Sequence, residues 1–299
     1  MNVKEMAVLV DGLFVDEAPS IWKSPFQWYP FPSSGDEAAD LLEELFSQGY
    51  STFVLHGGDE LAMAVVSAYF RRPRHGANEL SLIPLLSQGG LLGALLRGAP
   101  VSRAPDVLVR KGNWRREELP TLRVISSLEE SPRYGFSFAA GWLHDAMVAR
   151  QRARGGAANL MGAAGQFARE TFQFDGESPS FERSTLDYKP LDVSGDSLVV
   201  SSLERTYFGL QSSQRGATLF ADLEARTLLR SALTPELLRS NLEGQGFETL
   251  HLDGLSSWVL DHQFFEHDHP AVLEISSGPS VVALGPPRGV SARIGGLFR

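Results

Sequence analysis

Val54-Leu-His-Gly-Gly-Asp-Glu-Leu-Ala-Met-Ala-Val-Val66 is the segment that best predicts the fold. It begins with apolar residues, continues through two glycines and an acid, and ends in a stretch with helical apolar spacing, which predicts strand, tight turn and helix. Glycines let a backbone approach a phosphate closely, and a helix N-terminus presents free N–H groups to an anion. Gly57, Gly58 and Asp59 are therefore candidates for a phosphate loop, although the same residues also form an ordinary turn with a helix cap.

Strands and helices alternate on both sides of this segment over the first 120 residues. The apolar runs at residues 6–10, 52–55 and 80–83 predict buried strands, and each is followed by a stretch with helical spacing. Alternation of this kind predicts a parallel sheet flanked by helices, because parallel neighbours need a crossover connection.

The pattern changes near residue 120, and beyond residue 175 short β-like runs predominate. They predict an antiparallel, sandwich-like sheet that carries a helix or two. We therefore expect an α/β protein with a parallel-sheet domain over residues 1–120 and a β-rich domain over 121–285. Residues 286–299 would form a tail that could pack back on the first domain.

Composition excludes several classes of function. The chain has 299 residues, a net charge of −9 and no cysteine, so disulfides, thiolate zinc sites and cysteine nucleophiles are impossible. The negative charge argues against a nucleic-acid partner. Residues 1–10 lack the features of a signal peptide, and no apolar run approaches the roughly 18 residues needed to span a bilayer. We expect a cytoplasmic protein, with peripheral membrane contact still open.

Two groups of side chains leave alternatives open. The aromatic residues Phe26, Trp28, Tyr29 and Phe31 could enter a bilayer interface or cover the core beside the first strand. His262, His267 and His269 form the one histidine cluster of the sequence, and alternating histidines on a strand could bind metal. The other interpretation of this cluster is a polar hairpin tip.

Four segments, in this order, resemble the diacylglycerol and sphingolipid kinase family. The glycine turn is similar to the family's Gly-Gly-Asp-Gly-Thr signature, and Leu82-Ile-Pro-Leu-Leu-Ser-Gln-Gly-Gly-Leu-Leu-Gly-Ala-Leu95 is similar to its Ile-Pro-Leu-Gly-Thr-Gly-Asn-Asp block. Gly135-Phe-Ser-Phe-Ala-Ala-Gly-Trp-Leu-His-Asp-Ala-Met-Val-Ala-Arg150 resembles the start of the family's second domain. Val259-Leu-Asp-His-Gln-Phe-Phe-Glu-His-Asp-His-Pro270 lies where the family has Asp-Gly-Glu.

The resemblance implies a nucleotide-binding α/β domain, a β-rich domain for the lipid acceptor, and an active site in the cleft between them. As in that family, the last strands could return to the first domain. Gly57, Gly58 and Asp59, with the hydroxyl of Ser87, would hold the phosphates of ATP, and Asp59 could also act on Mg²⁺. Asp261 would be the base that orients the lipid hydroxyl. The implied activity is that of a divergent lipid kinase, which transfers the γ-phosphate to a diacylglycerol-, ceramide- or sphingoid-like alcohol.

The sequence departs from the family at several positions. The Asn-Pro pair that follows the family's first strand does not occur, Glu60-Leu61 replaces Gly-Thr, and Gln263 replaces the late glutamate. A carboxylate beside bound phosphates costs Coulomb energy unless a metal bridges it. The alternative function is therefore a catalytically inactive protein of this fold that acts as a binding or regulatory module. The pattern does not identify the metal ligands or the oligomeric state.

Overall fold

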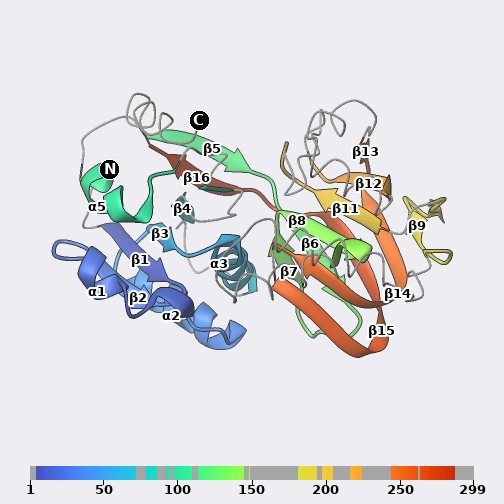
Figure 1. Ribbon diagram of the computed structural model, residues 1–299, viewed down its shortest axis with the longest axis horizontal. Coiled ribbons are helices and arrows are strands. Elements are labelled where there is room, and N and C mark those ends of the chain that lie inside the picture. Colours follow the sequence, from blue (N-terminus) through green and yellow to red (C-terminus); the bar gives the residue numbers. More distant parts are fainter. Residues whose placement is uncertain are drawn as a thin grey trace, which may run out of the picture. The chain divides into compact units, whose positions relative to one another are not determined.

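The structure, a computed structural model, divides the chain into two compact units (Figure 1). Unit 1 comprises Met1–Leu119 with Ser280–Arg299, and unit 2 is Pro120–Pro279. The residues that the structure describes are 5–71, 79–85, 92–93, 96, 98–109, 114–144, 148, 181–193, 197–204, 216–223, 244–261 and 263–286. Among them, no helix combines the length and the hydropathy needed to cross a bilayer.

Unit 1 contains a six-stranded, mostly parallel sheet in the order β2-β1-β3-β4-β16-β5. Its strands are β1 (Met6–Val10), β2 (Gln27–Pro30), β3 (Thr52–His56), β4 (Ser81–Pro84), β5 (Arg115–Leu119) and β16 (Val281–Gly285). Only β5 runs antiparallel to its neighbour, β16, and every other pair in this sheet is parallel. The predicted parallel α/β domain is confirmed, with an antiparallel edge strand added.

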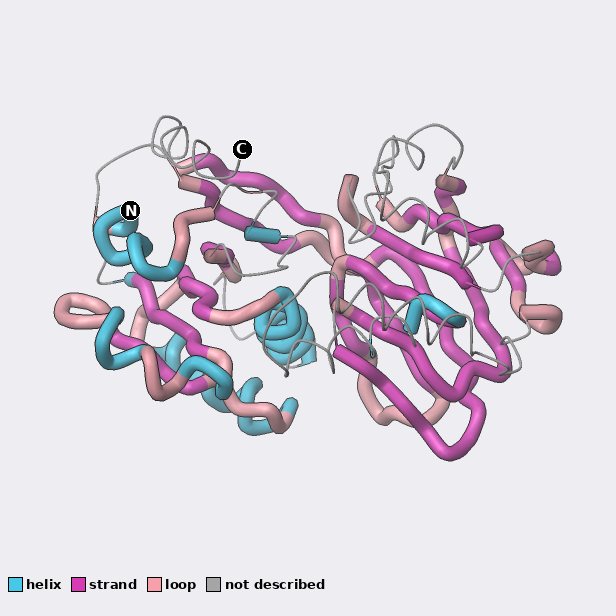
Figure 2. The backbone as a smooth tube through the Cα atoms, in the orientation of Figure 1, coloured by secondary structure: helices cyan, strands magenta, loops and turns pink. Residues whose placement is uncertain are grey.

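Helices connect these strands because parallel neighbours cannot be joined by a tight turn. The two longer ones, α2 (Gly35–Ser47) and α3 (Asp59–Arg71), have 13 residues each. The shorter ones are η2 (Gly12–Phe14), α1 (Ala18–Ile21), η3 (Val101–Arg103) and α5 (Ala104–Leu108). Figure 2 shows these helices as cyan segments between magenta strands. The first two predicted strands are therefore each followed by helix before the next predicted strand, as the alternation required, and the helix expected after β4 lies mostly outside the described residues.

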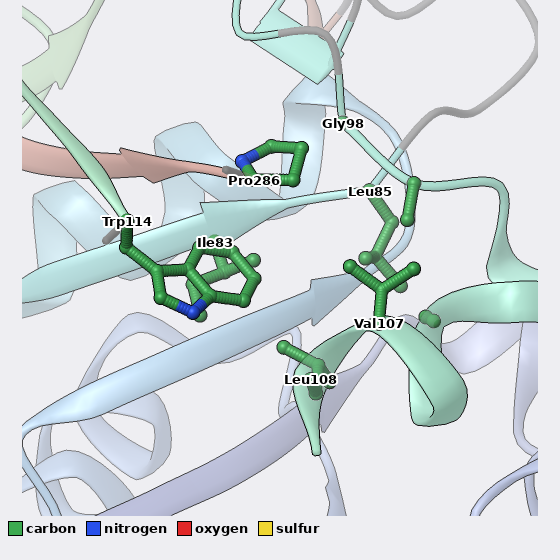
Figure 3. A pocket seen from close by; sticks show the side chains of 9 residues that line it. Ile83, Leu85, Gly98, Val107, Leu108, Trp114 and Pro286 are labelled. Carbon is green, nitrogen blue, oxygen red and sulfur yellow. The ribbon is translucent and has the colours of Figure 1, made fainter. Parts of the chain in front are cut away.

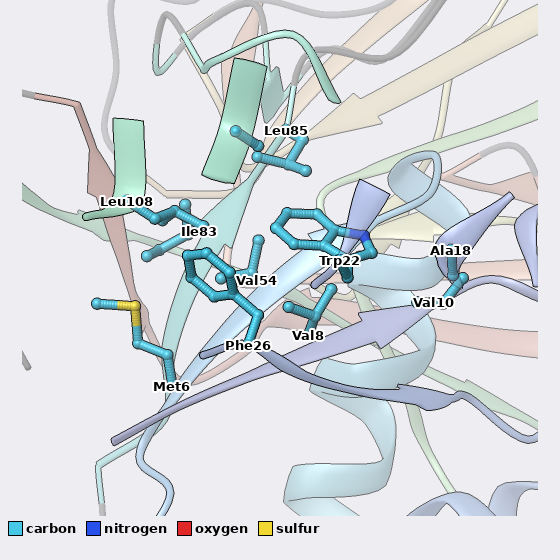
Figure 4. Close-up of a cluster of buried hydrophobic side chains, with 11 residues drawn as sticks. Met6, Val8, Val10, Ala18, Trp22, Phe26, Val54, Ile83, Leu85 and Leu108 are labelled. Carbon is cyan, nitrogen blue, oxygen red and sulfur yellow. The ribbon is translucent and has the colours of Figure 1, made fainter. Parts of the chain in front are cut away.

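A buried cluster packs against one face of the central strands (Figure 4). Alternate residues of β1 contribute to it, as expected when successive side chains point to opposite faces. Its members are Met6, Val8, Val10, Ala18, Trp22, Phe26, Val54, Ile83, Leu85, Ala104 and Leu108. Phe26 is thus a core residue, and Phe31 is also buried, whereas Trp28 and Tyr29 of β2 are half-buried. The interpretation of these aromatics as core residues therefore holds for Phe26 and Phe31.

Unit 2 is built on a ten-stranded antiparallel sheet with the central order β13-β12-β11-β8-β14-β15-β6-β7. Its strands are β6 (Leu122–Ser126), β7 (Arg133–Gly135), β8 (Ser137–Gly141), β9 (Thr185–Leu186), β10 (Lys189–Pro190), β11 (Ser197–Ser201), β12 (Thr218–Leu223), β13 (Gln245–Gly246), β14 (Thr249–Leu260) and β15 (Gln263–Ser277). The long β14–β15 hairpin lies at its centre (Figure 1). The predicted antiparallel β-rich region is confirmed.

The end of the chain differs from the expected domain limits. Residues 280–285, expected in the β-rich domain, belong to unit 1, because β16 hydrogen-bonds to β4 on one side and to β5 on the other. Their apolar pattern alone could not distinguish a strand of one sheet from a strand of the other. Of the expected tail, Pro286 is described and residues 287–299 lie outside the described part of the chain.

Candidate functional site

The predicted phosphate turn lies at the carboxyl end of parallel strand β3. His56 ends that strand, Gly57 and Gly58 form the turn, and helix α3 begins at Asp59. The backbone N–H of Asp11, which follows β1, donates to the carbonyl of His56 at 3.0 Å. The ends of two neighbouring strands therefore meet at this turn, which is where open parallel sheets bind ligands.

Gly57 is required by close packing. A Cβ atom placed there would lie 2.9 Å from the Cβ of Asp11 and 2.9 Å from Cδ2 of Leu61. Real Cβ atoms do not approach other carbons this closely, so a side chain would push the β1 loop away from α3. The glycine thus holds the end of β1, the turn and the first turn of α3 in contact.

The Asp59 carboxylate links the turn to the segment that resembles the family's second motif. Its side chain is only 4% exposed, and Oδ1 accepts a hydrogen bond from the backbone N–H of Leu92 at 3.3 Å. The first and second motif segments therefore meet through Asp59. Ser87, the candidate hydroxyl of the second segment, lies outside the described residues.

Gly58 faces the Glu60 side chain. The three atoms nearest to a Cβ placed at Gly58 all belong to the Glu60 carboxylate: Oε2, then Cδ at 3.3 Å and Oε1 at 3.9 Å. Both residues are half-buried. The residue that sequence comparison identified as a departure from the family therefore folds back over the glycine turn.

His56 is a feature of this site that sequence reasoning missed. The imidazole is buried, its Nδ1 accepts a hydrogen bond from Trp22 Nε1 at 2.9 Å, and the ring stacks on Phe14 at 5.4 Å between centroids. Burial lowers the pKa of His56, and the nearby carboxylates of Glu17 and Asp11 oppose that shift without overcoming it. With Nδ1 as acceptor, the neutral ring carries its proton on Nε2.

Asp261, the predicted base, lies in the turn between β14 and β15 and is completely buried. Its Oδ2 accepts from the N–H of Phe136 at 2.7 Å and its Oδ1 from the N–H of Ser137 at 2.8 Å. The backbone of Asp261 has a positive φ of 46° and its N–H donates to the carbonyl of Ser137 at 2.9 Å. The carboxylate therefore fastens the hairpin turn to the start of β8.

The histidines do not assemble a metal site within the described residues, where no group of three or more His, Asp or Glu side chains could hold a metal ion. His267 stacks on Trp258 with ring centroids 4.8 Å apart, and His269 is exposed on the same strand. His262 lies outside the described part of the chain. The described carboxylates therefore do not fit Mg²⁺ as a complete ligand set.

A small apolar pocket lies at the carboxyl end of β4 (Figure 3). It is lined by Ile83, Leu85, Gly98, Ala99, Ala104, Val107, Leu108, Trp114 and Pro286. Its interior of about 10 Å³ has room for one water-sized sphere and none for a nucleobase. The glycine turn is a separate feature of unit 1, where backbone N–H groups at a helix start favour an anion.

Comparisons with known proteins agree with this architecture. No protein-family profile and no curated protein sequence matches the chain. A crystal structure of a diacylglycerol kinase from Bacillus anthracis is similar over 97% of this chain and 99% of its own, with a TM-score of 0.59 and 12% identity. Two further structures from that organism, provisionally assigned as diacylglycerol kinases, have TM-scores of 0.60 and 0.57 at 11% and 12% identity; each match covers 97% of this chain and 100% of the other.

At these identities the comparisons establish the fold. The likeness extends over both units, because each match covers 97% of this chain. The resemblance seen in the four sequence segments is confirmed at this level: the chain has the fold of the diacylglycerol kinases.

Proposed function

We propose that this protein is a divergent lipid kinase that transfers the γ-phosphate of ATP to the hydroxyl of a lipid alcohol. The observation that carries the proposal is the glycine turn between β3 and the 13-residue helix α3. It lies at the carboxyl end of a parallel strand, it is in contact with the end of β1, and it is joined to the second motif segment through Asp59 and Leu92. The fold of the diacylglycerol kinases supports the same activity.

In this proposal each residue has a defined part. The N–H groups of Gly57, Gly58 and the first turn of α3 hold the phosphates of ATP, and Asp59 keeps that turn in place through Leu92. Asp261 orients the acceptor hydroxyl as the base. ATP with Mg²⁺ is the proposed phosphoryl donor, and no step is assigned to the metal, which in phosphoryl-transfer sites is held mainly by phosphate oxygens with one or two carboxylates.

The proposed acceptor is an amphiphilic alcohol of the diacylglycerol, ceramide or sphingoid class. This part rests on the fold and on the assignments of the structural neighbours, and no described side chain selects a headgroup. We propose that the protein meets its substrate from the cytoplasm, through peripheral contact with a membrane.

A second candidate function is a non-catalytic binding or regulatory module, and one observation favours it. Asp261 is fully buried and both of its carboxylate oxygens accept backbone N–H groups. A base must come within hydrogen-bond reach of the hydroxyl that it activates. Catalysis by Asp261 therefore requires the turn between β14 and β15 to open, whereas a binding module requires no such change.

Phosphate transfer from labelled ATP to lipid alcohols in mixed micelles, measured with Mg²⁺ present, tests the proposal. We expect transfer to at least one of diacylglycerol, ceramide and a sphingoid base, and none to soluble polyols. Gly58→Val should abolish both ATP binding and transfer, because its side chain blocks close approach to the turn. Gly12→Val is the matched control, since a Cβ atom at Gly12 meets nothing within 4 Å.

Asp261→Asn separates the two candidate functions. In a kinase it should abolish transfer while ATP still binds, because the base acts on the acceptor alone. ATP binding without transfer by the unsubstituted protein would contradict the kinase proposal and favour the regulatory module. Transfer by Asp261→Asn at the unsubstituted rate would remove Asp261 from the mechanism.

A further inference from the structure

The Glu60 carboxylate occupies the space beside Gly58. All three atoms nearest to a Cβ placed at Gly58 belong to that carboxylate, and Oε2 is the closest of them. A side chain at position 58 could not coexist with Glu60 in this position. The absence of a side chain at Gly58 therefore leaves space for the Glu60 carboxylate.

Electrostatics explains why a carboxylate lies there. The first turn of a helix has N–H groups without intrahelical acceptors, and its dipole places partial positive charge at that end. Glu60 is the second residue of α3, and its half-buried side chain is less screened by solvent than a fully exposed one. The same properties that attract a phosphate to this turn attract the carboxylate.

In the other long helix of unit 1, α2, a different kind of side chain lies beside the first glycine. Helix α2 also has 13 residues and two acids in its first turn, Asp36 and Glu37. There the space beside the first glycine, Gly35, is taken by the Arg71 guanidinium, and Glu37 is exposed. A first-turn acid alone therefore does not fold over a glycine.

We infer that Glu60 is an internal competitor of nucleotide phosphate, which must displace its carboxylate in order to bind the glycine turn. The inference rests on the proposed function, because it takes the turn as the place where the phosphates of ATP bind. It adds an autoinhibitory contact that sets the affinity of the site. Phosphate and carboxylate carry like charges, so the two cannot share the turn at contact distance without repulsion.

The test compares the unsubstituted protein with Glu60→Gln, which keeps the size of the side chain and removes its charge. Calorimetric titration with ATP and Mg²⁺ should give a dissociation constant about tenfold lower for Glu60→Gln, which is the modest end of the effect of one like charge near a protein surface. Glu60→Thr, which also shortens the side chain, should tighten binding at least as much. Glu37→Gln is the matched control and should leave the dissociation constant unchanged.

Adenosine separates competition for phosphate from a general effect on the fold. It has no phosphate, so its dissociation constant should be the same for the unsubstituted protein and for Glu60→Gln. An equal gain for adenosine and ATP would overturn the inference. Equal ATP affinities of the two proteins would overturn the inference and leave the proposed function standing. Failure of both proteins, and of Glu60→Thr, to bind ATP would overturn the proposed function and the inference with it.

Discussion

Asp59 and Asp261, the two aspartates that the sequence identified as catalytic, occupy similar environments in different units. Both are buried and both accept backbone N–H groups from a segment distant in sequence. Asp59 accepts from the N–H of Leu92 at 3.3 Å, whereas Asp261 accepts from the N–H groups of Phe136 and Ser137 at the shorter distances of 2.7 and 2.8 Å. A motif aspartate can thus hold the architecture together, and the hydrogen bonds from Phe136 and Ser137 to Asp261 are shorter than the one from Leu92 to Asp59.

The largest effect on stability should come from Asp261→Ala. The substitution leaves the amides of Phe136 and Ser137 buried without their acceptor, and hydrogen bonds to charged groups contribute about 1.5–3 kcal/mol each, so unit 2 should lose roughly 3–6 kcal/mol. Hydrogen exchange at the strand β8 amides measures this loss directly.

Asp261→Asn is the control for this prediction. It retains one acceptor oxygen, and asparagine tolerates the positive φ of this position, so it should lose about half as much. A loss below about 1 kcal/mol for the alanine variant would show that the two bonds are not what holds the hairpin turn.

Gly57→Ala should have the next largest effect, about 1–3 kcal/mol, since it overpacks the contact between Asp11 and Leu61. Thermal or denaturant unfolding measures it. Gly12→Ala, at the start of the neighbouring short helix η2 and with open space around its Cβ position, should change stability by less than about 0.5 kcal/mol. Equal effects of the two substitutions would contradict the close approach at Gly57.

Asp59→Asn should cost less than either, about 0.5–1.5 kcal/mol, because the amide oxygen can still accept from Leu92 and what is lost is mainly the negative charge at the start of α3. The same denaturation experiment gives the value. If Asp59→Asn destabilised the protein more than Asp261→Ala, the ranking of the two aspartates would be reversed.

The sequence predicted the architecture well because hydrophobic patterns carry that information. Strands β1 and β3 are short apolar runs that are buried throughout, and each precedes helix as alternation requires. The glycine turn was found for the same reason, since strand, glycines and helix follow one another directly. The pattern does not contain the partner of each strand, so it placed β16 with the β-rich domain, and only the family resemblance left room for its return to the first domain.

The site was predicted less completely because its contacts join residues distant in sequence. Nothing near Asp261 in sequence indicates that the amides of Phe136 and Ser137, more than 120 residues away, bind its carboxylate. His56 carried a weak signal, since a histidine at the end of an apolar strand is unusual, but its partner Trp22 is 34 residues away. Glu60 was identified as a departure, although its contact with Gly58 was not foreseen.

The smallest expected effect is on the pH dependence of the free energy of unfolding, and it concerns His56 of unit 1. Because burial lowers the pKa of His56, the unfolded chain binds its proton at higher pH than the folded one. Stability from this residue is present above the ordinary histidine pKa of about 6.5 and is lost as the pH falls through the lower, folded pKa. His56→Gln should flatten this acid slope in denaturant unfolding, and an unchanged slope would contradict the assignment.

Nuclear magnetic resonance of glycine-labelled protein tests the central claim most directly, namely that the Gly57–Gly58 turn receives phosphate. Among the 29 glycines, the two signals can be assigned by their loss in Gly57→Ala and Gly58→Ala. On titration with ATP and Mg²⁺, the amide signals of Gly57 and Gly58 should shift together and saturate, while Gly49, which follows helix α2, remains unchanged. ATP binding that saturates with the Gly57 and Gly58 signals unmoved would contradict the account.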